Sequence, residues 1–255
     1  MATEHDTDPI WALPQPTDRK PRYTREQIVA AALRIADTEG FDAVTMKRIA
    51  AELGAGTMTV YYYVRNKTDI VALMQDAILA GLLIPGRELP AGWREAIAAI
   101  ARRTRQVLMA HPWSLTSLND AQFGPNAIRH VEQSLAAVAG TGLPAAARLE
   151  FIAIVDDYVS GNVLHTVESL ARARAAEEDP AMVTAAITYG LTQLQTGDFP
   201  ELSALYKLSA LYEGSSAAQG GEPAGPPMTD AALASQFERG LQALLDGLAA
   251  RMNLA

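Results

Sequence analysis

The spacing of the apolar residues is the feature that limits most strongly how this chain can fold. Along most of the 255 residues, apolar side chains recur every three or four positions, which places them on one face of an α-helix. No window shows the sustained alternation of β-branched residues that is typical of strands. The sequence therefore predicts an all-α protein without a sheet.

Glycines, prolines and capping residues predict where the helices begin and end. Thr24 and Gln27 match a capping box, so a first helix is expected from Thr24 to Gly40. The later helices are expected over 45–54 and 57–63, from Asn66 or Thr68 to just before Pro85, and near 92–110, 114–121, 126–138, 144–175, 180–196, 199–212 and 229–252.

Composition divides the chain into an arm, a head and a body. Residues 1–20 are rich in proline and acidic residues and are expected to form a flexible arm. Residues 21–67, the head, are expected to form three short helices, and residues 68–255, the body, a larger helical domain. Within the body, the Gly-, Pro- and Ser-rich residues 213–228 predict a flexible linker.

The charge of the chain is unevenly distributed. The net charge is −8, yet residues 19–67 hold nine Lys and Arg against five Asp and Glu, while both flanking parts are acidic. Attraction to phosphate depends on the local face rather than on the whole chain, so a polyanion could dock on this segment. The same excess also fits ordinary surface scatter, and charge alone leaves both interpretations open.

Several classes of protein are excluded by what the sequence lacks. Without cysteine there is no disulfide, thiolate nucleophile, cysteine zinc site or iron–sulfur cluster. The four histidines lack metal-binding spacing, and neither a phosphate-binding glycine loop nor a G-x-S-x-G motif occurs, so neither enzyme activity nor a cofactor is expected. No apolar run approaches a membrane span and the acidic N-terminus is unlike a signal peptide, which predicts a cytoplasmic protein.

The most informative stretch is residues 45–67, TMKRIAAELGAGTMTVYYYVRNK. Two short helices joined by a glycine turn have the layout of a helix-turn-helix, whose second helix enters the DNA major groove. Thr45 at a helix N-terminus suits a phosphate, and Lys47 and Arg48 can reach a phosphate or a guanine edge. The candidates at the base-facing end of the second helix are Thr57, Met58 and Thr59.

Three consecutive tyrosines follow in the same motif. Tyr61 and Tyr62 are expected to point outward and to bind phosphates through their hydroxyls, with Arg65 and Lys67 adding positive charge. Tyr63 is expected to lean toward the core, because three consecutive helical side chains cannot all face solvent. A bare capping role for Thr45 and a purely structural helix pair remain alternatives, but the combined features favour DNA binding.

From Thr24 to about Leu73 the chain resembles the DNA-binding domain of the TetR (tetracycline repressor) family. The element TVYYYVRNK carries this resemblance most specifically. The other matching residues are Ile28–Ala32, Gly40-Phe41, Thr45, Ile49-Ala50, Leu53-Gly54 and Leu73. The body agrees in architecture, and the residues at Asp42, Met46 and Met58 resemble the branch with a tetracycline-repressor-type C-terminal domain.

The resemblance implies a homodimer bound to a palindromic operator in double-stranded DNA. It implies backbone contacts by Thr45, Tyr61, Tyr62 and Lys67, and base-facing positions at Lys47, Thr57, Met58 and Thr59. Met58 stands where the namesake-type motif has a proline, and Tyr63 where it has a histidine. The operator sequence therefore cannot be carried over.

The resemblance also implies that the body binds a small-molecule effector and dimerises through helices near 144–175 and 229–252. The apolar face of 229–252 supports an intersubunit role, although an ordinary core helix shows the same pattern. The candidate ligand-lining residues are polar or aromatic side chains within apolar helices: Trp113, Asn119, Gln122, Phe123, Asp157, Tyr158, Asn162 and His165. A lone histidine such as His165 is more often a hydrogen-bonded core or interface residue.

Together these features predict an effector-responsive transcriptional repressor. In this mechanism the ligand favours a conformer whose recognition helices no longer match the operator, and the helix that begins near Asn66 acts as the lever. A ligand-independent architectural DNA binder and a transcriptional activator remain the alternatives.

Overall fold

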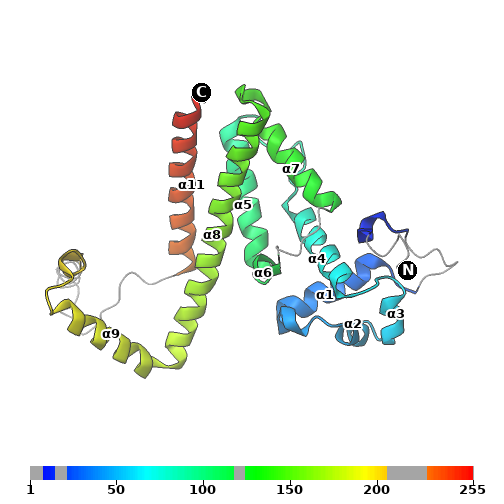
Figure 1. Cartoon of the computed structure of the whole chain (residues 1–255), viewed down its shortest axis with the longest axis horizontal. Coiled ribbons are helices and arrows are strands. Elements are labelled where there is room, and N and C mark those ends of the chain that lie inside the picture. The colour runs from blue at the N-terminus through cyan, green and yellow to red at the C-terminus, as the bar shows by residue number, and fades with distance from the viewer. Residues whose placement is uncertain (1–7, 15–21, 118–123, 206–228, 255) are drawn as a thin grey trace. The chain divides into compact units, whose positions relative to one another are not determined.

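The computed structural model describes residues 8–14, 22–117, 124–205 and 229–254 (Figure 1). Within these ranges every regular element is a helix, which confirms the predicted all-α fold. No helix of the described ranges is long and apolar enough to cross a membrane. The chain divides into two compact units, residues 1–164 with 241–255, and residues 165–240.

The head folds much as its capping residues predict. Its elements are α1 (Arg25–Glu39), the 3-10 helix η3 (Phe41–Ala43), α2 (Met46–Glu52) and α3 (Thr57–Tyr61), followed by α4 (Lys67–Leu82). Thr24 and Gln27 form the expected capping box, and Asn66 rather than Thr68 caps α4, accepting from the Asp69 backbone N–H at 2.9 Å. Gly40 and Gly54 end their helices with φ of 90° and 64°, conformations that favour glycine.

A single hydrophobic core holds the head helices together. Ile28 and Ile35 of α1, Ile49 of α2 and Val60 of α3 are each at most 1% exposed, and Ile70 of α4 is fully buried with them. Since α2 and α3 have only seven and five residues, this shared burial rather than helix propensity stabilises them.

Residues 8–14 differ from the flexible arm that composition predicted for residues 1–20. They include the 3-10 helix η2 (Ile10–Ala12), and Ile10 is 1% exposed. The guanidinium of Arg25 donates hydrogen bonds to the carbonyl oxygens of Ile10, Leu13 and Pro14 at 3.2, 3.0 and 3.2 Å. A buried arginine with three backbone partners docks this segment, although its composition alone is typical of disorder.

Helix α4 continues from the head into the body. It packs against α1, and also against α5 (Trp93–Ala110) and α7 (Pro125–Ala137). Because these contacts join head and body, the division into compact units does not fall at residues 67 and 68, where composition placed the boundary. The short α6 (Ser114–Ser117) covers only the described part of the helix expected over 114–121.

The rest of the first unit includes η5 (Ala139–Thr141), the first part of α8 (Ala145–Glu178) and the last part of α11 (Asp230–Met252). The rings of Trp93 and Phe151 meet edge to face with centroids 5.8 Å apart. Leu241 and Leu245 of α11 are fully buried. The apolar face of 229–252 is thus already covered within one chain, as in the core-helix alternative.

The second unit contains the remainder of α8 and of α11, together with α9 (Pro180–Leu194). Asp179 caps α9, accepting from the Met182 backbone N–H at 3.0 Å. No residue of α9 is buried, and Met182 and Tyr189 are 56% and 68% exposed. The linker expected at 213–228 and residues 206–212 of the helix expected over 199–212 lie outside the described residues.

Ile10→Ala should lower the free energy of unfolding by about 2 to 4 kcal/mol, because removing most of a buried side chain leaves a cavity in its place. Ile128→Ala is the matched control, since that side chain is 57% exposed and its loss should cost about 0.5 kcal/mol or less. Urea unfolding followed by circular dichroism measures both. Equal, small losses would show that residues 8–14 do not pack on the head in solution.

Candidate nucleic-acid interface

The helix-turn-helix of the head presents the N-terminal end of α3 to solvent. Thr45 caps α2 by accepting from the Arg48 backbone N–H at 3.1 Å, and Gly54 makes the turn that leads to α3. Thr57 and Thr59 are half-buried, whereas Met58 is 78% exposed. A large apolar side chain held in water at a helix start suits an apolar contact such as a thymine methyl group.

The three tyrosines divide as the sequence predicts. Tyr61 and Tyr62 are 46% and 49% exposed, while Tyr63 is 6% exposed. The Tyr63 hydroxyl accepts from the Tyr23 backbone N–H at 3.2 Å, and the Tyr63 carbonyl accepts from Arg25 Nε at 3.1 Å. The expected inward orientation of Tyr63 is confirmed, and two phenol rings remain at the surface.

The basic side chains of the head fall into two groups. Lys47 and Lys67 are exposed, with the Lys67 ammonium 5.2 Å from the Phe41 ring centroid. Arg65 instead donates from Nε and Nη2 to the Asp69 carboxylate at 2.9 and 2.8 Å, and from Nη2 to the Asp8 carbonyl at 2.8 Å. Arg65 therefore connects α4 to the N-terminal segment.

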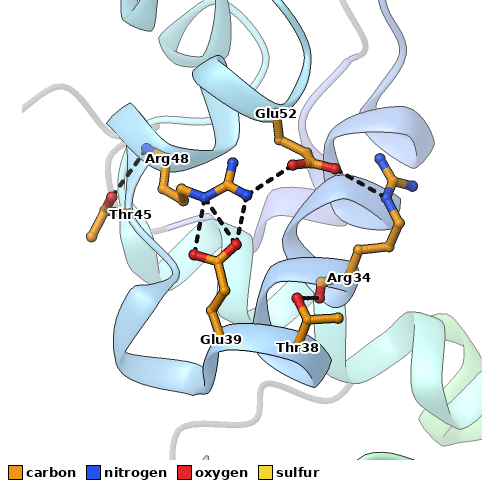
Figure 2. A network of polar contacts seen from close by, with 6 residues as sticks. All are labelled: Arg34, Thr38, Glu39, Thr45, Arg48 and Glu52. Carbon is orange, nitrogen blue, oxygen red and sulfur yellow. Dashed lines mark hydrogen bonds and ion pairs between the residues drawn. The ribbon is translucent and has the colours of Figure 1, made fainter.

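Arg48 belongs to the second group (Figure 2). Its Nε and Nη2 donate to the Glu39 carboxylate, with distances of 3.0 Å from Nε to Oε2 and 2.6 Å from Nη2 to Oε1. Its Nη2 also donates to Glu52 at 3.0 Å, and Glu52 accepts from Arg34 Nε at 3.3 Å. The sequence assigned Arg48 to DNA and did not anticipate these two carboxylate partners.

These contacts also shift the acidity of the carboxylates. Hydrogen bonds from Arg48 hold the pKa of Glu39 and that of Glu52 below their usual range, with Arg34 adding to the effect at Glu52. Burial alone would raise the pKa of Asp69, but the hydrogen bonds and charge of Arg65 outweigh it and lower that pKa. All three groups stay ionised at neutral pH, so the ion pairs persist there.

Several polar contacts join the head and α4 to the rest of the first unit, among them those of two carboxylates, Asp37 and Asp76. Asp37 of α1 accepts a hydrogen bond from Trp113 Nε1 at 2.8 Å, and its carboxylate lies 2.8 Å from His111 Nδ1. Trp113 also stacks on Phe41 with ring centroids 5.3 Å apart. Trp113 was predicted to line a ligand site, and its indole is in contact with the head.

The Asp76 contact is an N-terminal cap of α7 supplied by α4. The Asp76 carboxylate accepts from the Asn126 backbone N–H at 2.8 Å and from Asn126 Nδ2 at 2.7 Å. A Cβ atom on Gly124 would collide with the Asp76 carboxylate, so glycine is the residue that leaves room for this cap. The start of α7 is thereby tied to a side chain in the middle of α4.

The predicted ligand residues of the body are spread over differing environments. Asp157 is exposed, Tyr158 is half-buried, and Asn162 is half-buried and accepts from Arg105 Nε at 3.0 Å. His165 is exposed and belongs to the second unit. Asn119, Gln122 and Phe123 lie outside the described residues. No group of three or more potential metal ligands occurs within the described ranges.

Two features of the first unit were not anticipated from the sequence. An open groove of about 390 Å³ lies between α1 and α4, with Val29, Leu33, Leu73 and Ala77 among its lining residues, and includes none of the predicted ligand residues. In α8, burial and the neighbouring Asp157 raise the pKa of Asp156 to about 6. A raised carboxyl pKa marks a group held partly away from water.

Comparison with known proteins identifies the family. The model of bacterial regulatory proteins of the tetR family matches residues 28–74, and that of the tetracyclin repressor-like C-terminal domain matches residues 85–218. The chain belongs to the TetR family of transcriptional regulators. The second match covers more than half of the chain, and the first contains the whole helix-turn-helix.

Individual TetR-family relatives align along most of the chain. The HTH-type transcriptional repressor DrrR1 of Streptomyces coeruleorubidus is 31% identical over 90% of this chain and 78% of its own length. An HTH-type transcriptional regulator of Saccharopolyspora erythraea is 30% identical over 96% and 93%. The crystal structure of the TetR-family protein ActR of Streptomyces coelicolor in complex with (S)-DNPA has a TM-score of 0.64 and 26% identity over 91% of this chain and 98% of ActR.

Asp156→Asn should flatten the pH dependence of stability between about pH 4 and 6, the interval between the unfolded and folded pKa of this carboxyl. A pKa raised on folding means that the folded state binds the proton more tightly, so stability falls as the pH rises through about 6. At pH 7.5 the variant should be more stable than the parent by about 1 to 3 kcal/mol.

The comparison variant is Asp157→Asn, which removes the same charge from the exposed neighbouring position. Because burial is the larger cause of the raised pKa of Asp156 and Asp157 the smaller one, this variant should keep the pH dependence of the parent in reduced form. Urea titrations at several pH values measure all three proteins. Parallel pH profiles for the parent and Asp156→Asn would contradict burial of the Asp156 carboxyl.

Proposed function

We propose that this TetR-family regulator is a dimeric repressor that binds a palindromic operator and is released by a small-molecule ligand. The exposed N-terminal end of α3 carries this proposal. Met58 stands 78% exposed there, with the exposed Tyr61 and Tyr62 farther along the same motif. The surface thus pairs a base-facing helix end with groups suited to phosphates.

The proposed DNA contacts follow exposure. Lys67 and the tyrosine hydroxyls of Tyr61 and Tyr62 would bind phosphates, together with Thr45 at the start of α2. The base-facing residues would be Lys47, Thr57, Met58 and Thr59. Arg48 is left out of both sets, because its Nε and Nη2 already bind carboxylates.

A small-molecule effector is proposed for the body. Support comes from the tetracyclin repressor-like C-terminal match and from ActR, whose structure contains (S)-DNPA. The candidate lining residues remain Trp113, Asn119, Gln122, Phe123, Asp157, Tyr158, Asn162 and His165. A ligand among these helices would shift α4, because Asp76 joins α4 to α7 and Asp37 joins the head to His111 and Trp113.

A homodimer through the helices near 144–175 and 229–252 is part of the proposal. On α8, Leu149 and Leu164 are 53% and 48% exposed, so this helix keeps apolar side chains for a partner. On α11 the regular apolar face is buried within the chain. The contribution of α11 to a dimer would therefore come from its exposed residues, such as Gln242 and Ala243.

Selection of bound fragments from random duplex DNA tests the proposal directly. A dimer should enrich a palindrome with half-sites about one helical turn apart, and two chains should bind each duplex in sedimentation analysis. An effector should then dissociate that complex. Enrichment of no sequence would favour the architectural alternative, and transcription increased by binding would favour an activator.

Single substitutions should separate phosphate contacts from base contacts. Lys67→Ala should weaken binding to all sequences and reduce the slope of log K against log salt by about 1, whereas Thr57→Ala and Lys47→Ala should relax sequence preference. Arg87→Ala is the charge control, because this exposed arginine lies beyond the end of α4. Fluorescence anisotropy on cognate and random duplexes measures each variant. An equal loss on both duplexes for Lys47→Ala would contradict its base-reading role.

A further inference from the structure

Four charged residues of the head, Arg34, Glu39, Arg48 and Glu52, form an ion network (Figure 2). The network connects α1 to both halves of α2. Glu39 is the last residue of α1 and Glu52 the last residue of α2, with Arg48 between them. Arg34, one turn or more before the end of α1, binds Glu52 from the other side at 3.3 Å. Positive and negative groups alternate along this chain of contacts, so each carboxylate lies between or beside guanidinium groups.

The edge of the Arg48 guanidinium that carries Nε and Nη2 is already occupied by carboxylates. Both oxygens of Glu39 accept from Nε, at 3.1 and 3.0 Å, and Nη2 adds contacts of 2.6 Å to Glu39 and 3.0 Å to Glu52. A guanidinium binds a phosphate most strongly through two parallel N–H groups. For Arg48 to use this edge on DNA, a phosphate would have to displace Glu39.

The helix that Arg48 holds is short and also packs on the head core, with Met46 partly buried against it. Only Ile49 and Ala50 of α2 are buried, and the helix is seven residues long. It packs against both α1 and α3. A change in the angle between α1 and α2 would therefore be passed to α3, whose first residues are the base-facing ones.

We infer that Arg48 is a positioning residue for the recognition helix, which it serves by clamping α2 to the end of α1 through Glu39 and Glu52. This inference rests on the proposed DNA-binding function and refines it: Arg48 acts on DNA affinity through the orientation of α3 and not through a phosphate. Glu39, an acidic residue in a DNA-binding head, then favours DNA binding despite its charge.

The sign of the Glu39→Gln effect separates the two roles. If Glu39 positions Arg48, the substitution should weaken binding to the selected duplex by about threefold. If Arg48 contacts phosphate, the same substitution removes a competing negative charge and should tighten binding. Asp42→Asn is the matched control, since it removes one negative charge from the exposed loop between α1 and α2 and should leave binding unchanged or slightly tighter.

Arg48→Ala supplies a second measurement with the same duplex. If Arg48 is a positioning residue, the Arg48→Ala variant should bind the duplex more weakly with an unchanged slope of log K against log salt. If Arg48 contacts a phosphate, the variant should reduce that slope by about 1. A tighter Glu39→Gln complex, or a reduced slope for Arg48→Ala, overturns the inference.

If the wild-type chain enriches no operator, that result counts against the proposed function itself. The inference about Arg48 can then still be tested by amide hydrogen exchange, which needs no DNA. Exchange within residues 46–61 should be about threefold faster in Glu39→Gln and Arg48→Ala than in Asp42→Asn. Equal exchange in all three variants overturns the positioning role, whatever the DNA result.

Discussion

The head depends on the burial of one face of α1. Helices as short as α2 and α3 are not stable alone, because too few hydrogen bonds follow the unfavourable first turn. Ile28 and Ile35 of α1 provide the apolar surface on which Ile49 and Val60 are buried. The N-terminal segment, whose Ile10 is buried, packs against α4 and is held by Arg25. Burial also lowers the pKa of Arg25, whose hydrogen bonds to carbonyl groups offset part of the cost of desolvation.

Polar contacts then divide the basic residues of the head by role. Arg25, Arg48 and Arg65 have carbonyl or carboxylate partners, while Lys47 and Lys67 extend into solvent. Arginine suits the first role because its planar fork binds two acceptors at once, and lysine suits a flexible contact with phosphate. A basic segment is therefore only partly a DNA-binding surface, and part of its charge stabilises the fold.

Local signals were sufficient to predict most of the fold. The capping residues at Thr24 and Thr45, the glycine turn and the inward Tyr63 all depend on neighbours within a few positions, and the structure has them as expected. The partners of Arg48 and the docking of Ile10 could not be predicted, because they depend on side chains brought together by tertiary packing. The apolar pattern of 229–252 also cannot distinguish a face buried within the chain from one buried between chains, and the fold covers it internally.

The cap that Asp76 places on α7 has an evolutionary consequence. The Asp76 carboxylate leaves no room for a side chain at position 124. Asn126 donates two hydrogen bonds to the same carboxylate. Positions 124 and 126 lie together at the start of α7, whereas position 76 lies in α4, yet the Asp76 cap makes the three positions depend on one another. Across related sequences they should vary as a set, with a larger residue at position 124 tolerated where position 76 has lost its acid.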